Sequence, residues 1–141
     1  MNYIEYGKKN SNVMILLHGG GLSWWNYREV AEKLQSDYHI ILPILDGHAE
    51  SDRDFTTIED NANEIIEFID DQFGASVLLM GGLSLGGQIL VEILSRRKDI
   101  CKYAIVECSS RKSRSRYGCY GKHPAFVFQW DLCKYCGGSC L

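Results

Sequence analysis

Short apolar runs alternate regularly with amphipathic segments along the chain. Short, largely apolar runs occur at 13–17, 39–42, 77–80 and 103–106. Between them, apolar residues recur at helical spacing within 27–34, 62–73 and 89–94. Strands that are apolar on both faces and alternate with helices are typical of a parallel sheet covered on both sides. The pattern therefore predicts an α/β fold with a mostly parallel sheet. Residues 1–6 alternate weakly and are a candidate edge strand.

Local signals predict where these helices and strands begin and end. Ser23 precedes the first helical segment and is a favoured N-cap residue. Thr57, followed three positions later by Asp60, resembles a capping arrangement at the start of the second helix. Gly74 stands where a glycine commonly ends a helix. Pro43 is expected to close the second buried strand.

The chain changes character after Cys108. Residues 1–108 hold 9 Lys+Arg and 17 Asp+Glu, a balance of −8, whereas 109–141 hold 6 and 1, a balance of +5. We expect a folded core over 1–108 and a basic, cysteine-rich, irregular tail over 109–141, in which 125–130 is one candidate strand. If the sheet ends at 103–106, that strand presents a long apolar edge, which favours aggregation.

Several classes of protein are disfavoured by the sequence. The N-terminus lacks the apolar core of a signal peptide, and no apolar run approaches the roughly 20 residues of a membrane helix. We expect a cytoplasmic protein without a membrane span, with its six cysteines mostly as reduced thiols and not as a disulfide framework. Since no recognition motif accompanies the basic tail, we expect no nucleic-acid partner. No cofactor is expected either.

The segment Gly82-Leu83-Ser84-Leu85-Gly86 stands between the third apolar run and the helical segment after it. A serine at a sharp strand-to-helix turn projects its hydroxyl away from the sheet, and glycines on either side let helix and strand approach closely. The N-terminus of the helix offers unpaired N–H groups to a developing oxyanion. We interpret Ser84 as a nucleophile. The alternative is a serine that caps a helix in a glycine-rich turn.

A second glycine-rich segment, His18-Gly19-Gly20-Gly21, directly follows the first apolar run. In such a loop, backbone N–H groups can face a substrate carbonyl oxygen. The alternative is an ordinary turn between strand and helix. We expect His18 to hold the loop rather than to act as a base. Trp24 and Trp25, close by, either line an acyl pocket or pack in the core.

Segments 16–21, 46–52 and 82–87 together resemble the α/β-hydrolase superfamily, in its usual order and over about residues 1–108. The middle segment resembles that family's D-x-x-G-H-G-x-S loop in weakened form. The resemblance implies an α/β-hydrolase-like sheet and a serine hydrolase acting on a small-molecule ester or related acyl bond. It implies Ser84 as nucleophile and the N–H of Leu85, with that of Gly20 or Gly21, as oxyanion donors. It makes His48 a loop residue, not the base.

The catalytic acid and base are harder to find. In this fold the nucleophile is followed by the acid and then by the histidine. His123 is the one histidine after Ser84, and Glu107, at the end of the fourth apolar run, is the order-compatible acid. Only 15 residues separate them, too few for the strand–helix units that normally precede this histidine. The alternative is therefore a C-terminally truncated, catalytically incomplete hydrolase or a pseudoenzyme, whose C-terminal part is missing or replaced.

A minor alternative is a zinc-binding tail. Cys133-x-x-Cys136 has the spacing of a zinc half-site, and Cys119, Cys140 and His123 are further ligand types. A second C-x-x-C pair is missing, so we favour fortuitous cysteines and expect no metal site.

Overall fold

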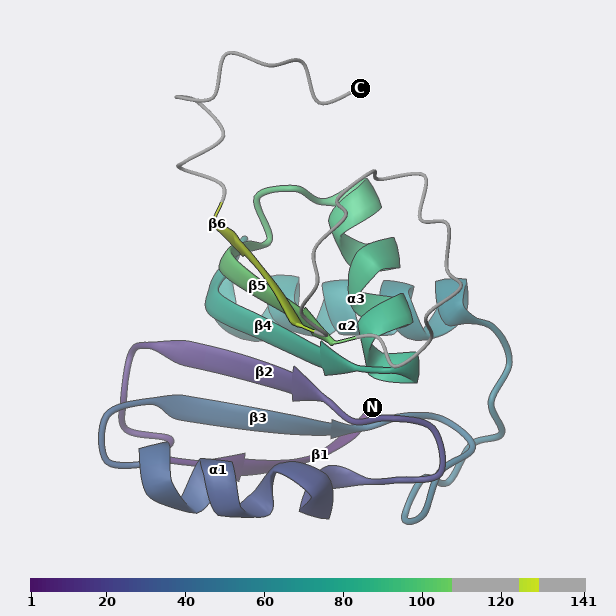
Figure 1. Ribbon diagram of the computed structural model, residues 1–141, viewed down its shortest axis with the longest axis horizontal. Helices are drawn as coiled ribbons and strands as arrows, with labels where there is room; N and C mark the ends of the chain where they lie inside the picture. Colours follow the sequence, from purple (N-terminus) through teal and green to yellow (C-terminus); the bar gives the residue numbers. More distant parts are fainter. Residues whose placement is uncertain (108–124, 130–141) are drawn as a thin grey trace.

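The computed structural model describes residues 1–107 in full and the backbone of 125–129. In these ranges the chain forms a six-stranded mixed sheet with the order β1-β3-β2-β4-β5-β6 (Figure 1). The strands are β1 Asn2–Tyr6, β2 Val13–Leu17, β3 His39–Ile44, β4 Val77–Leu83, β5 Cys101–Glu107 and β6 Ala125–Gln129. The helices are the 3-10 helix η1 Trp24–Tyr27, α1 Arg28–Leu34, α2 Ile58–Phe73 and α3 Leu85–Arg96.

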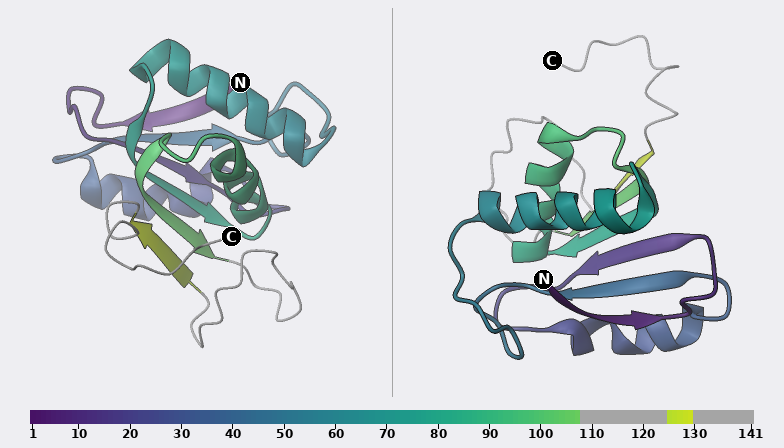
Figure 2. Two further views of the ribbon diagram at one scale, coloured as in Figure 1. Left: turned by 90° about the horizontal axis from the view of Figure 1, so that it is seen from above. Right: turned by 180° about the vertical axis from the view of Figure 1, so that it is seen from behind.

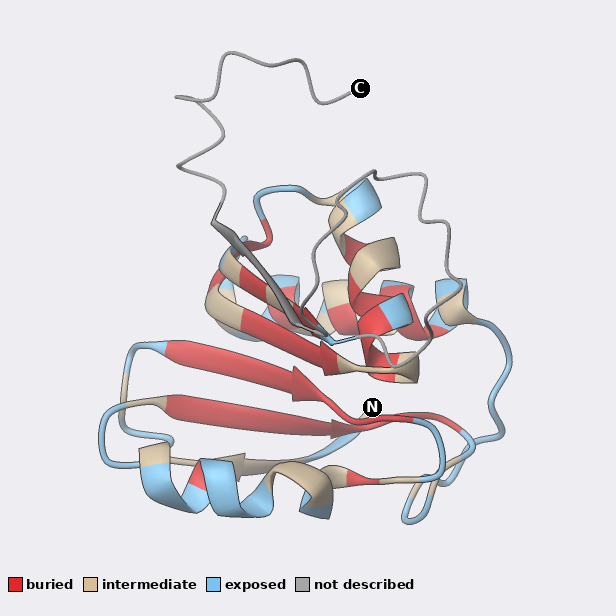
Figure 3. Cartoon of the chain, in the orientation of Figure 1, coloured by how far each residue is buried: buried red, intermediate tan, exposed pale blue. Residues whose placement is uncertain are grey.

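Helices cover both faces of the sheet, as the sequence predicts. The views in Figure 2 show α1 on one face and α2 with α3 on the other. Each face has its own apolar core, and the buried residues follow the central strands (Figure 3). The core under α2 and α3 includes Ile15, Leu17, Ile65, Ile69, Ile89 and Leu90. The core under α1 is built from Met14, Leu16, Ala31, Ile40 and Leu42. Alternate residues of β2 therefore enter opposite cores, which explains why its apolar run is continuous.

The direction in which successive strands are added to the sheet reverses at β2. From β2 the chain crosses to β3 on one side, and β4 then pairs with the other side of β2. All three strands are parallel, so the segments after β2 and β4 leave the same edge of the sheet. Open α/β sheets bind ligands at such a reversal, beyond the carboxyl ends of the strands. The fold thus brings residues 18–22 and Ser84 to one place.

Two expectations about strand ends are wrong. β3 runs through Pro43, which pairs with Tyr3 of the antiparallel edge strand β1. The pairing of β3 with β2 ends at Ile41, so Pro43 occupies a stretch with a neighbour on one side only, where a missing N–H is tolerated. In addition, β5 is not an open edge, because the candidate strand at 125–130 forms β6, which pairs antiparallel with β5 from Tyr103 to Glu107.

The helix ends agree with the sequence predictions better than the strand ends do. The Thr57 hydroxyl accepts a hydrogen bond from the Asp60 backbone N–H, and Gly74 ends α2 with a positive φ of 81°. Ser23 precedes η1, as expected, but its side chain makes no capping hydrogen bond.

Some sequence predictions fall on residues that the structure does not describe. These are His123 and the tail cysteines at 119, 133, 136 and 140. In the part of the chain that is described, none of the helices is long and apolar enough to span a membrane.

Candidate functional site

Ser84 lies at the sharp turn between β4 and α3. Its backbone has φ 50° and ψ −106°, in a region that residues other than glycine seldom adopt. Such conformations persist only where the surrounding structure imposes them, and they gather at functional sites. The side chain is half-buried and does not cap α3. The capping role considered as the alternative is therefore not the one this hydroxyl performs.

Glycines on both sides of Ser84 allow the tight turn. A Cβ on Gly82 would lie 2.4 Å from the carbonyl oxygen of Gly86, across the turn. A Cβ on Gly86 would lie 2.3 Å from the carbonyl oxygen of Leu17 and 2.6 Å from that of His18. Side chains at these positions are sterically excluded, as the sequence motif predicts. Gly86 thus lets the start of α3 press against the end of β2.

We call the turn at residues 82–86 the elbow. Two of its backbone N–H groups, those of Ser84 and Gly86, donate to carbonyl oxygens outside it, and one does not. The N–H of Ser84 donates to the carbonyl oxygen of Glu107 at 2.7 Å, and the N–H of Gly86 donates to that of His18 at 3.2 Å. The N–H of Leu85, between them, has no acceptor within the described residues. It lies at the first position of α3, where the helix dipole favours negative charge.

Residues 18–22, which we call the glycine loop, form a turn beside this group. The N–H of Leu22 donates to the carbonyl oxygen of Gly19 at 3.1 Å, and Gly21 has a positive φ of 74°. The N–H groups of Gly20 and Gly21 make no hydrogen bond to any described residue. A Cβ on Gly20 would lie 3.8 Å from the Cβ of Leu85, so the glycine loop and the elbow are in contact.

Both ring nitrogens of His18 form hydrogen bonds that hold the glycine loop. Its imidazole is fully buried. Nδ1 lies 2.9 Å from the carbonyl oxygen of Gly19, and Nε2 accepts a hydrogen bond from the backbone N–H of Leu45 at 3.1 Å. Nε2 as acceptor assigns the proton to Nδ1. Burial lowers the pKa of His18; the hydrogen bond to Gly19 partly opposes this shift, and the nearby His48 adds to it.

The other described imidazoles also have partners. Nδ1 of His48 lies 2.9 Å from the carbonyl oxygen of Asp46, and its ring packs edge-on against that of His18. His39 lies at the opposite end of β3, 3.1 Å from a carboxylate oxygen of Glu5. Neither ring is hydrogen-bonded to Ser84.

Glu107, the candidate acid, ends β5 and pairs with Leu83 of β4. Its side chain is exposed and makes no ion pair within the described residues. Burial raises the pKa of Tyr27 to about 12, and the negative charge of Glu107 contributes to this shift. The structure therefore places Gly20 against Leu85, next to Ser84, with Glu107 on the neighbouring strand end. Gly21 follows Gly20 in the glycine loop.

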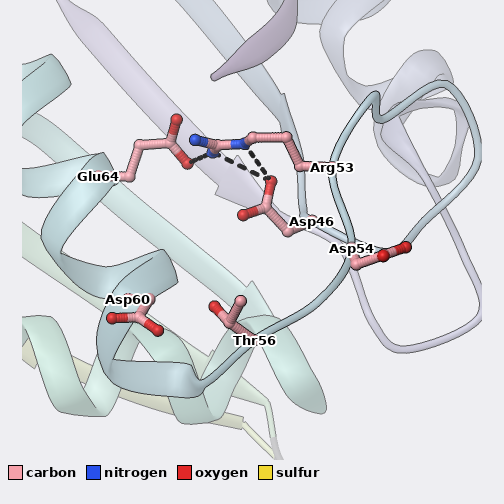
Figure 4. Close-up of a pocket in the computed structure, with 6 residues that line it drawn as sticks. All are labelled: Asp46, Arg53, Asp54, Thr56, Asp60 and Glu64. Carbon is pink, nitrogen blue, oxygen red and sulfur yellow. Dashed lines mark hydrogen bonds and ion pairs between the residues drawn. The ribbon is translucent and has the colours of Figure 1, made fainter.

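A separate polar hollow lies along the segment between β3 and α2 (Figure 4). Arg53 bridges the carboxylates of Asp46 and Glu64 across it. It is lined by Asp46, Arg53, Asp54, Thr56, Asp60 and Glu64, without a residue of the elbow or the glycine loop. Within the described ranges, no group of three His, Cys, Asp or Glu side chains is arranged to hold a metal ion.

The sequence did not reveal how the glycine loop is fastened to the segment after β3. The Ser23 hydroxyl donates to the carbonyl oxygen of Ala49 at 3.1 Å, and the Trp24 indole N–H donates to Glu50 at 2.8 Å. Trp24 packs against the core under α1, whereas Trp25 is 48% exposed. Each of these hydrogen bonds joins residues 26 positions apart in the sequence. The periodicity of helices and strands, which relates near neighbours, therefore does not predict them.

Comparison with known proteins places these observations in a family. A family model described as the alpha/beta hydrolase fold matches residues 12–126. Lipase 1 of Psychrobacter immobilis is 30% identical over 111 residues, which cover 76% of this chain and 35% of the lipase. Lipase 3 of Moraxella sp. (strain TA144) is 32% identical over 94 residues, 64% of this chain and 30% of the lipase.

Among solved structures, a marine microorganism esterase superposes with a TM-score of 0.66 at 25% sequence identity. The match covers 73% of this chain and 39% of the esterase. The chain spans about a third of the length of the curated lipases that it matches.

Proposed function

Because this chain belongs to the alpha/beta hydrolase family, we propose that it carries the nucleophile and the oxyanion donors of a serine hydrolase. Ser84 is the nucleophile, and an ester or related acyl bond of a small molecule is the substrate. The observation that carries the proposal is the left-handed backbone of Ser84 at the junction of β4 and α3. The names of the related lipases and the esterase support the substrate class.

The proposed reaction follows from the donors around Ser84. Its Oγ attacks the acyl carbon while a base takes the hydroxyl proton, and the carbonyl oxygen becomes an oxyanion. The N–H of Leu85 and that of Gly20 or Gly21 donate to the oxyanion, since these groups have no acceptor among the described residues. The alcohol leaves with the proton from the base. Water, activated by the same base, then releases the acid from Ser84.

Glu107 and His123 are the proposed acid and base. Glu107 supports this role by its place at the end of β5, where its carbonyl oxygen already accepts the N–H of Ser84. His123 is proposed from its order in the chain alone, and it lies outside the described residues. Their roles predict that Glu107→Gln and His123→Ala each slow acylation of Ser84 strongly.

A catalytically incomplete chain is the second candidate. It is favoured by the hydrogen bonds of the described imidazoles, because His18, His39 and His48 all have partners other than Ser84. Such a chain would retain the oxyanion donors and bind acyl compounds without turning them over.

Hydrolysis of p-nitrophenyl acetate separates the two candidates. The full chain, Ser84→Ala and Ser95→Ala are compared, the last as a control because Ser95 is exposed on α3 and donates only to Glu92. A serine hydrolase loses activity in Ser84→Ala and keeps it in Ser95→Ala. Equal rates for all three proteins would refute hydrolysis through Ser84.

A further inference from the structure

We propose that Ser23 is a positioning residue for the oxyanion donors, acting through the segment that follows β3. This inference rests on the proposed function. We call residues 45–53 the acidic loop. Ser23 joins the end of the glycine loop to the acidic loop, and the joint holds the N–H groups of Gly20 and Gly21 towards Ser84.

Ser23 is placed for this role and not for capping. It is fully buried, and its backbone is extended, as in an N-cap residue. Yet its hydroxyl makes no hydrogen bond to η1 and donates instead to the carbonyl oxygen of Ala49 at 3.1 Å. Burying a hydroxyl is costly unless it is hydrogen-bonded, so this bond fixes where the side chain can lie.

The acidic loop is itself held in an uncommon conformation at the point of contact. Glu50 has a positive φ of 71°, which is unusual for a residue with a side chain. Its carboxylate accepts the indole N–H of Trp24 at 2.8 Å, and its carbonyl oxygen accepts the Asn2 side-chain amide at 3.3 Å. Arg53 ties the other end of the loop to Glu64 on α2. The surface to which Ser23 binds is therefore fixed from several sides.

The glycine loop is thus anchored at both of its ends. At its start, Nε2 of His18 accepts the N–H of Leu45, the first residue of the acidic loop. At its end, Ser23 donates to Ala49 of the same loop. The consecutive glycines between the anchors have no side chains to restrain them, and glycine is the most mobile residue in a loop. Oxyanion donors act well only when they are held in place before the reaction.

The test uses Ser23→Ala and Trp24→Phe in the full chain, with Ser95→Ala as the matched control. Trp24→Phe keeps an aromatic ring but removes the donor to Glu50, so it remains informative if Ser23→Ala fails to fold. Two quantities are measured: the hydrogen-exchange rate of the Leu22 amide, and the kinetics of Ser84 modification by an alkyl fluorophosphonate.

We expect Ser23→Ala to accelerate exchange of the Leu22 amide by about tenfold, the effect of losing one hydrogen bond of average strength. Amides in α2 should be unaffected. The maximal modification rate should fall by about as much, with the half-saturating concentration unchanged, because donor geometry and not ground-state binding is altered. A purely structural role would lower the melting temperature without this selective effect on the maximal rate.

Wild-type exchange and modification kinetics in both variants would overturn the proposal. A wild-type chain that is inert towards the fluorophosphonate would contradict the proposed function instead. In that case the Leu22 exchange rate still decides whether Ser23 and Trp24 anchor the loop.

Discussion

At Gly86 the first turn of α3 comes so close to β2 that a side chain has no room. A Cβ there would lie 2.3 Å from the carbonyl oxygen of Leu17, which belongs to a central strand and cannot easily withdraw. We predict that Gly86→Ala lowers the free energy of unfolding by about 3 kcal/mol, the usual scale of overpacking. Urea denaturation measures this.

Gly20→Ala is the control for that substitution. A Cβ on Gly20 makes only ordinary contact, 3.8 Å from the Cβ of Leu85, and the N–H is retained. Its stability should stay within about 0.5 kcal/mol of wild type. Equal losses in the two variants would show that close packing at Gly86 is not the cause.

His18 gives the stability a dependence on pH. Burial lowers the pKa of the folded imidazole, so the unfolded chain binds more protons below its ordinary pKa of about 6.5. The stability due to the neutral, buried ring is complete above that pH. It is lost progressively as the pH falls towards the lowered pKa of the folded state.

We therefore expect His18→Gln to be less stable than wild type but to show a flatter pH profile between about pH 5 and 7.5. Unfolding by urea at several pH values provides the comparison. The prediction fails if the two profiles run parallel, because the titrating group would then lie elsewhere.

For single residues, the sequence predicts those roles that depend only on neighbouring residues in the chain. The motif around Ser84 requires glycines at 82 and 86, and the structure shows both close approaches. Ser23 illustrates the limit. Its identity favours an N-cap, but its hydroxyl binds Ala49, which only the packing of two loops brings near.

Among the elements, the helices and the central strands were predictable because each buries apolar residues at its own period. The strand ends were not. β3 passes through Pro43 because its pairing with β2 has already stopped at Ile41, and this depends on register, not on composition. The pairing of β6 with β5 is likewise a contact between distant segments.

The pairing of β5 with β6 leads to a test by proline substitution. Val127 pairs with Ile105 and Phe126 with Val106, and neighbouring residues of a strand point their N–H groups to opposite sides. One of Phe126→Pro and Val127→Pro should thus remove a ladder hydrogen bond and lower the free energy of unfolding by about 2 kcal/mol. The other should be nearly neutral. Two neutral variants in thermal or urea unfolding would argue against this pairing.

On the scale of the whole molecule, the reversal of the chain beside β2 creates the site. The glycine loop follows β2 and Ser84 follows β4, and the two strands are parallel neighbours. The proximity of the glycine loop and Ser84 could be predicted from the order of the apolar runs and the glycine motifs. His123 stays the predicted base, since it lies outside the described residues and the described imidazoles have partners other than Ser84.

The intact mass of the full chain after reaction with an alkyl fluorophosphonate, followed by peptide mapping, tests whether Ser84 is the nucleophile. Oγ of Ser84 bonds to phosphorus, and fluoride and the hydroxyl proton leave. We predict one adduct per chain, on Ser84, which is absent from Ser84→Ala and present in Ser95→Ala. An unmodified wild-type chain, or equal labelling of Ser84→Ala, would contradict Ser84 as the nucleophile.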